Sequence, residues 1–177
     1  MKLLRIIGGL AALFVLLTIG VSIGQDAKNS DAALNENLKL LEPIVNKKWV
    51  GVLGSPDGKQ QAQVVRKFNV VWDGNAIKRT DYCMALKNEG EAFIFWDPAE
   101  QNIKIFSINN RGIFLNGVAT DDSGKILISG RVTFPDTSFN YRNTFELTDD
   151  GKLLDKWYAF RGGEWKAGHI VELIAED

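Results

Sequence analysis

Turn signals recur about every ten residues from Ser55 onward and leave only strand-length segments between them. Gly, Asn and Asp tolerate the positive φ angles of tight hairpins, and Pro presets φ for a turn. The signals are Ser55-Pro56-Asp57-Gly58, Asp73-Gly74-Asn75, Asn88-Glu89-Gly90, Asp97-Pro98, Asn109-Asn110-Arg111-Gly112, Asp121-Asp122-Ser123-Gly124, Pro135-Asp136, Asp149-Asp150-Gly151 and Gly162-Gly163. Because no long helical pattern lies between them, the sequence predicts an antiparallel all-β meander.

The segments between these turns predict ten strands. We expect them at 47–53, 61–72, 76–86, 91–97, 102–108, 112–120, 125–134, 138–148, 152–160 and 164–174. A long meander must protect its edge strands, and closing the sheet removes the edges. The prediction is therefore a single ten-stranded up-and-down β-barrel over residues 47–177. A two-sheet sandwich is the alternative, although its crossings usually need longer connections than these.

Strand alternation is clearest in the later segments. Ile126, Ile128 and Val132 share one face of segment 125–134, and Tyr141 and Phe145 share one face of segment 138–148. One apolar face and one polar face is typical of antiparallel strands that cover a core. These apolar faces are expected to line the barrel interior.

A short helix is expected before the first strand, over residues 31–41. Ser30 or Asp31 can cap it, and Leu34, Leu38 and Leu41 recur at helical spacing. Pro43 follows and should help to end it. Such a helix cannot bury its apolar stripe alone, so it should lie against the barrel or plug one end.

The N-terminus has the layout of a targeting segment over residues 1–24. Lys2 and Arg5 precede the uncharged, mostly apolar stretch 6–24, and Ser22 and Gly24 suit positions −3 and −1 of a cleavage site. The alternative is an uncleaved membrane anchor, since the stretch is long enough to span a bilayer. Either way the folded part is expected outside the cytosol, periplasmic or secreted. Residues 25–46 then form a polar linker and the short helix.

Composition excludes several classes of site. The 177-residue chain has a formal charge of −1, one Cys and one His. A lone Cys83 cannot form an intrachain disulfide, and with His169 it makes no zinc cluster. The absence of a basic excess argues against nucleic acid, and membrane contact is expected only through residues 6–24 if they stay uncleaved.

The entry to the first strand and two late hairpins point to a known family. The residues are Leu41-Glu42-Pro43-Ile44-Val45, Trp49-Val50-Gly51, Asp150-Gly151-Lys152 and Gly163-Glu164-Trp165. Together they resemble the lipocalin-like (calycin) barrels, most of all secreted bacterial lipocalin-like proteins of unknown function. The likeness to nitrobindin-type haem barrels is weaker. The resemblance implies that Trp49 and Gly51 close one barrel end, and that a small apolar or amphipathic molecule binds inside.

The chain departs from the lipocalin pattern near Trp49. Lys47 stands where lipocalins have the Gly of Gly-x-Trp. Lipocalins also set a basic side chain from the last strand across this Trp, and Lys166 or Arg161 would have to serve here.

His169 is the first candidate for chemistry. It is in phase with Trp165, Ala167, Val171 and Leu173 on the last predicted strand, so its ring should point inward. The resemblance to haem barrels implies a proximal ligand at this position, and an inward imidazole suits that role. The alternative is a buried His hydrogen-bonded to a neighbour, with no cofactor.

Strand charges form a second group of candidates. Alternation favours the solvated outer face for Arg79, Asp81, Arg131, Arg142 and Asp155. An inward, paired arginine, with Arg79 as the candidate, could instead hold a ligand carboxylate through two hydrogen bonds.

Three aromatic residues complete the predicted binding set. Tyr141 is the inward polar candidate, and Trp157 and Trp165 could stack on a flat ligand or simply fill the interior. Cys83 is expected to be a buried, inert thiol. Because the sequence contains no catalytic motif, a non-enzymatic binding barrel is expected. A structural or protein-interaction barrel with a filled core, or a haem barrel using His169, remains open.

Overall fold

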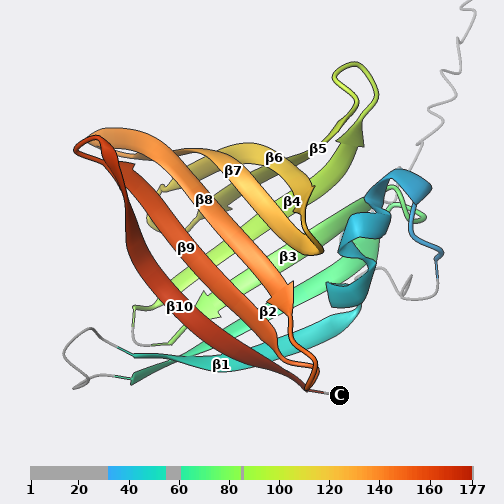
Figure 1. The fold of residues 1–177 in the computed structure, drawn as a ribbon, viewed down its shortest axis with the longest axis horizontal. Coiled ribbons are helices and arrows are strands. Elements are labelled where there is room, and N and C mark those ends of the chain that lie inside the picture. The colour runs from blue at the N-terminus through green and yellow to red at the C-terminus, as the bar shows by residue number, and fades with distance from the viewer. Residues whose placement is uncertain (1–31, 55–60, 85, 177) are drawn as a thin grey trace, which may run out of the picture.

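The computed structural model of the chain describes residues 32–54, 61–84 and 86–176. One short helix and ten antiparallel strands make up this part (Figure 1). The strands are β1 (Lys47–Gly54), β2 (Gln61–Val71), β3 (Ala76–Cys83), β4 (Asn88–Asp97), β5 (Asn102–Asn109), β6 (Phe114–Asp122), β7 (Lys125–Phe134), β8 (Thr137–Leu147), β9 (Leu153–Arg161) and β10 (Glu164–Glu176). All ten predicted strands are confirmed.

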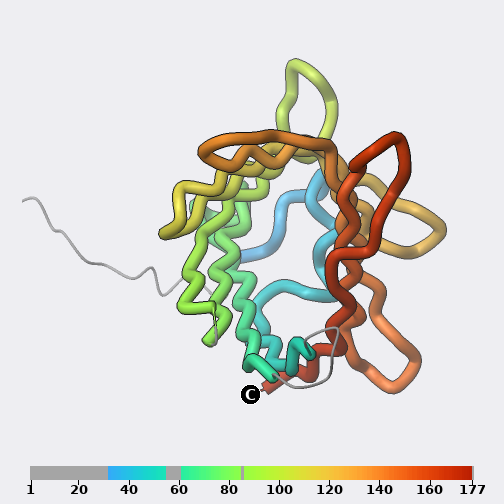
Figure 2. Tube along the Cα trace, turned by 90° about the vertical axis from the view of Figure 1, so that its left-hand side faces the viewer, coloured from blue at the N-terminus to red at the C-terminus, as the bar shows by residue number. Residues whose placement is uncertain are grey.

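The sheet closes on itself. Each strand pairs with its neighbours in sequence, and β1 also pairs with β10 through Trp49 opposite Ala175 and Gly51 opposite Leu173. Figure 2 shows the strands running around a central opening, with the segment that contains the helix inside their outline. Closure satisfies the edges of both end strands, which confirms the predicted up-and-down barrel and excludes the two-sheet sandwich.

The tight turns are formed by the Gly and Asp residues that predicted them in the sequence. Asp73 and Gly74 have φ angles of 52° and 89° between β2 and β3, and Gly162 and Gly163 have 62° and 84° between β9 and β10. A Cβ on Gly74 would lie 2.0 Å from the carbonyl oxygen of Ala33. A glycine here lets the segment before the helix approach the β2–β3 turn, where the backbone N–H of Asn35 donates to the carbonyl oxygen of Gly74 at 3.0 Å. The predicted turn at 55–58 lies outside the described residues.

The helix η1 differs from the predicted one in type and bounds. It is a 3₁₀ helix over Glu36–Ile44, and the side chain of Asn35 caps it by accepting from the backbone N–H of Asn37 at 2.9 Å. Pro43 lies inside it, so the expectation that Pro43 ends the helix was wrong. Residues 41–44, which precede the first strand, belong to the helix, and the helix ends at Ile44. The proposed caps Ser30 and Asp31 lie outside the described residues.

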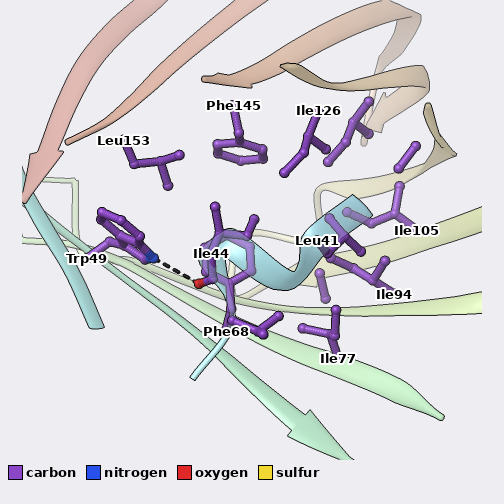
Figure 3. Close-up of a cluster of buried hydrophobic side chains, with 14 of the residues drawn as sticks. Leu41, Ile44, Trp49, Phe68, Ile77, Ile94, Ile105, Ile126, Phe145 and Leu153 are labelled. Atoms are coloured by element: carbon purple, nitrogen blue, oxygen red, sulfur yellow. Dashed lines mark hydrogen bonds between the residues drawn. The ribbon is translucent and has the colours of Figure 1, made fainter. Parts of the chain in front are cut away.

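One end of the barrel is filled with apolar side chains (Figure 3). Leu38 and Leu41 of η1 are fully buried among strand residues, and Trp49 donates from Nε1 to the carbonyl oxygen of Ile44 at 3.0 Å. The strand residues in this cluster include Phe68, Ile77, Ile94, Ile105, Ile126, Phe145 and Leu153. The helix therefore plugs this end, as its amphipathic pattern predicted.

A bulge in β10 changes which residues face inward. The β9–β10 register shifts between Ala167 and His169, and Gly168 occupies the extra position. A Cβ on Gly168 would lie 2.2 Å from the ring of Trp157, so a side chain there would collide with the indole. The shift puts Trp165 on the outer surface while His169 faces the lumen. The prediction that these two residues share a face was wrong because the sequence pattern assumed an unbroken strand.

The predicted targeting segment 1–24 lies outside the described residues. Within the described ranges, no helix is long and apolar enough to cross a bilayer.

Candidate ligand-binding cavity

The half of the barrel beyond the apolar plug is hollow. It holds a cavity of about 370 Å³ that reaches the end of the barrel opposite η1, where Leu86 is exposed. This volume lies within the range of about 300–1,000 Å³ typical of small-molecule sites. Its apolar walls include the strand residues Leu53, Val64, Leu115, Val132, Phe134 and Val171.

A layer of charged side chains lies between the plug and this hollow. At its centre is Asp155 of β9, which is completely buried. Its Oδ2 lies 2.5 Å from Nη1 of Arg66 and 3.3 Å from Nε2 of His169, and its Oδ1 accepts from Nδ2 of Asn143 at 2.6 Å. A buried carboxylate is tolerated only with such partners.

The neighbours of Asp155 hold it in its charged form. Burial alone would raise the pKa of this carboxyl group, but Arg66, then His169 and Asn143, outweigh burial and leave the pKa below its ordinary value. Asp155 is therefore a fixed negative charge inside the barrel at neutral pH.

Asp81 of β3 joins the two arginines. Its Oδ2 accepts from Nε of Arg79 at 2.9 Å, and its Oδ1 lies 3.4 Å from Nε of Arg66. The second contact is poorly aligned, since neither of its atoms forms a hydrogen bond with a described residue. The inward register of Arg66 opposite Asp81 explains why both charges can be buried side by side.

Arg79 differs from Arg66 in that its terminal nitrogens are not engaged by a carboxylate of the described residues. Its side chain is only 9% exposed, it lines the cavity, and Asp81 engages its Nε. Nη1 and Nη2 form no hydrogen bond with any residue the structure describes. A guanidinium group has five N–H donors, and its terminal pair matches the two oxygens of a carboxylate. The terminal nitrogens of Arg79 are thus left without a hydrogen-bond partner among the described residues.

His169 lines the same cavity but is already engaged. Its Nε2 faces Asp155, and its ring stacks on Trp157 with centroids 6.0 Å apart and planes 10° from parallel. The ring is in the lumen, as its phase with Val171 and Leu173 predicted. Trp157 also lines the cavity, so these two predicted candidates lie together.

Three charges expected outside lie inside. Arg79, Asp81 and Asp155 face the lumen, so the prediction of a solvated face was wrong for them. These charges can be buried because they are paired with charges on other strands. The alternation of apolar and polar residues within one strand cannot reveal such pairing. Arg131 and Arg142 are exposed as expected, with Arg142 4.3 Å from the centroid of Trp165.

Sequence reasoning missed Arg66 and the site role of Asn143. Arg66 shares its face with Val64, Phe68 and Val70, an apolar phase in which a charged residue is unusual. That break in the pattern, matched by Asp155 in the apolar phase of β9, was the available signal.

Tyr141 is buried, with 1% of its surface exposed, and its hydroxyl forms no hydrogen bond with a described residue. Burial raises the pKa of this phenol, and the charge of Arg79 offsets only part of the effect. The ring lies across Gly117 and Gly130, because a Cβ on Gly117 would come 2.7 Å from the hydroxyl oxygen. Tyr141 belongs to the apolar core and does not line the lumen cavity. Tyr141 and Trp165 instead border the hollow on the outer face.

Trp49 has a different cation from the ones expected. It is fully buried at the plugged end, and the Nζ of Lys47 lies 5.5 Å from its ring centroid. Lys166 pairs with Glu164 instead, and Arg161 lies over Phe139. The residue that replaces the lipocalin Gly thus takes the place of the expected strand cation.

Other features of the described chain are weaker candidates for a functional site than the lumen. Cys83 is a buried free thiol on the cavity wall, as expected. No group of three or more His, Cys, Asp or Glu residues in the described ranges could hold a metal ion. A wider hollow of about 770 Å³ lies on the outer face between Phe95 and Trp165, but no buried charge lines it. The lumen is therefore the strongest candidate site.

Comparison with known proteins adds no relative. No family model matches the chain, and no curated protein matches its sequence.

Proposed function

We propose that this barrel binds one small amphipathic molecule, with an anionic head on Arg79 and an apolar tail along the cavity walls. The observation that carries the proposal is a buried arginine on the wall of a hollow lumen, whose terminal nitrogens have no hydrogen-bond partner among the described residues. A carboxylate would fill that vacancy with two charge-assisted hydrogen bonds. The chain would then act by binding and not by catalysis.

The resemblance to lipocalin-like barrels supports this function. A closed ten-stranded barrel with one plugged end and one hollow end is compatible with the container that such proteins build. The targeting pattern of residues 1–24 supports an extracytoplasmic place of work, periplasmic or secreted, with anchoring if that segment stays uncleaved.

Octanoate and octanol test the proposal directly, because they share a chain and differ in charge. Binding can be followed by native mass spectrometry and by the intrinsic tryptophan fluorescence, to which Trp157 on the cavity wall contributes. We expect octanoate to bind more tightly than octanol. In Arg79→Met, octanoate should lose about 10- to 100-fold in affinity, since a hydrogen bond to a charged group contributes about 1.5–3 kcal/mol.

Arg142→Met is the matched control because Arg142 is an exposed strand arginine outside the lumen. It should bind octanoate like the wild type. If neither compound binds, or if Arg79→Met and Arg142→Met weaken octanoate equally, the proposed head-group site is wrong.

Two other functions receive less support. In a haem barrel, His169 would offer one nitrogen to iron, but its Nε2 faces Asp155 and its ring face is covered by Trp157. Added haemin should therefore give the same absorbance spectrum with wild type and with His169→Ala, and a difference would favour haem. A purely structural barrel would fill its interior, and the cavity is evidence against that alternative.

A further inference from the structure

The arginines and aspartates around the lumen are equal in number and paired with one another. Two arginines, one aspartate and one imidazole line the cavity, together with the uncharged Tyr82 and Cys83 side chains: Arg66 from β2, Arg79 and Asp81 from β3, and His169 from β10. Asp155 from β9 lies buried behind them, in contact with Arg66 and His169. With His169 neutral, these groups together therefore have no net charge.

An anion on Arg79 would upset this balance. The positive charge of Arg79 is already matched by Asp81 at 2.9 Å, so a bound carboxylate would leave one excess negative charge in a mostly apolar cavity. Uncompensated charge is costly in such surroundings, by several kcal/mol for an ion after relaxation. The site needs one more positive charge when it is occupied.

We propose that the lumen takes up one proton, on His169, together with a singly charged anion. This inference rests on the proposed function and names the charge of its ligand. A neutral molecule of the same shape would enter without a proton, and a dianion would exceed what one proton can balance.

His169 is the group suited to carry this proton. Imidazole is the side chain whose ordinary titration lies between about pH 5 and 8. Its Nε2 already points at Oδ2 of Asp155, which would accept the hydrogen bond of the protonated ring, and 27% of its side chain is exposed, which lets a proton reach it.

The remaining groups cannot play this part. Asp155 is held ionised by Arg66, and Asp81 has a guanidinium group on each side. Loss of a proton from Tyr141 or Cys83 would add negative charge, the opposite of what an anion requires. The titration of His169 is the one change in this layer that restores neutrality.

Calorimetry in two buffers of different ionisation enthalpy measures the proton uptake. At about pH 7.5, where an ordinary imidazole is mostly neutral, octanoate should bind with uptake of close to one proton. Octanol should bind with none. Above that pH the octanoate affinity should fall about tenfold for each pH unit, the slope that linkage gives for one proton.

His169→Gln removes the titration and keeps a donor for Asp155. In this variant octanoate should bind without proton uptake, and its affinity should be flat across the same pH range. Lys166→Gln is the control, because Lys166 is an exposed residue on the same strand. It should behave like the wild type.

The possible results separate the two proposals. If octanoate binds the wild type without proton uptake, or if the uptake persists in His169→Gln, the inference is wrong while the binding function stands. If neither octanoate nor octanol binds, the binding function fails and the inference fails with it.

Discussion

At the scale of single residues, Asp155 holds the interior of the barrel together. It is completely buried, and its contacts reach strands on both sides of the lumen: Arg66 on β2, Asn143 on β8 and His169 on β10. A buried ion pair contributes little compared with apolar packing, but removing one partner leaves the other charge unpaired. The layer is therefore sensitive to any single loss.

Asp155→Asn should lower the free energy of unfolding by about 3 kcal/mol at neutral pH, because Arg66 would keep only its misaligned contact with Asp81. The depressed pKa of Asp155 adds a pH dependence. Its contribution is complete above the ordinary Asp value of about 4 and is lost as pH falls through the lower folded-state pKa, so wild type and variant should converge in acid.

Urea unfolding across pH measures both effects. Glu146→Gln is the control, since Glu146 pairs with Lys125 and Lys156 at the surface and should cost less than about 1 kcal/mol. An Asp155→Asn protein as stable as this control would mean that the buried layer is not needed for folding.

At the scale of elements, η1 fills one end of the barrel and leaves the opposite end hollow. Leu38, Leu41 and Ile44 enter the lumen from this helix, and Asn35 ties its start to Gly74 through a backbone hydrogen bond of 3.0 Å. The charged layer lies on this apolar plug. Arg79 holds its position in this layer through its place on β3, opposite Phe68 of β2 and Ala92 of β4.

Leu41→Ala should cost about 2–5 kcal/mol, because truncation leaves a void in a fully buried position. Lys39→Ala on the same helix is the control, because Lys39 is exposed and pairs only with Glu36 among the described residues. Thermal or urea unfolding distinguishes them. Equal stabilities of the two variants would show that η1 is not part of the core.

Local turn chemistry explains why the ten strands could be predicted. Gly, Asn and Asp at regular spacing determine where the chain reverses, and reversal alone decides an antiparallel meander. The polar layer could not be predicted in the same way. Arg66, Asp81 and Asp155 lie on different strands, and their charges are paired only once the barrel has closed. The β10 bulge could not be predicted either. Nothing in the sequence around Gly168 indicates that a side chain there would collide with Trp157.

At the scale of the whole molecule, the barrel depends on the seam between its first and last strands. Gly51 of β1 lies opposite Leu173 of β10, and a Cβ there would come 2.3 Å from the carbonyl oxygen of Glu172. Backbone cannot yield to such a contact without moving the strand. Closure thus requires a glycine at position 51, two residues after Trp49.

Gly51→Ala should therefore destabilise the protein by about 1–3 kcal/mol, as overpacking does. It should also speed amide hydrogen exchange in β1 and β10. Gly54→Ala is the matched control on the same strand, because no atom lies within 4 Å of its added Cβ. Unchanged exchange at the seam in Gly51→Ala would contradict this account of closure.

The plug also affects which ligands the proposed site would select. A molecule entering from the open side meets a floor at the level of Arg79, whereas nothing in the described chain sets a ceiling above its other end. Chains of different lengths would all dock at the same depth, and the longer ones would extend into solvent. On the proposed function, the barrel would select its ligands by the chemistry of the head group and not by the length of the chain.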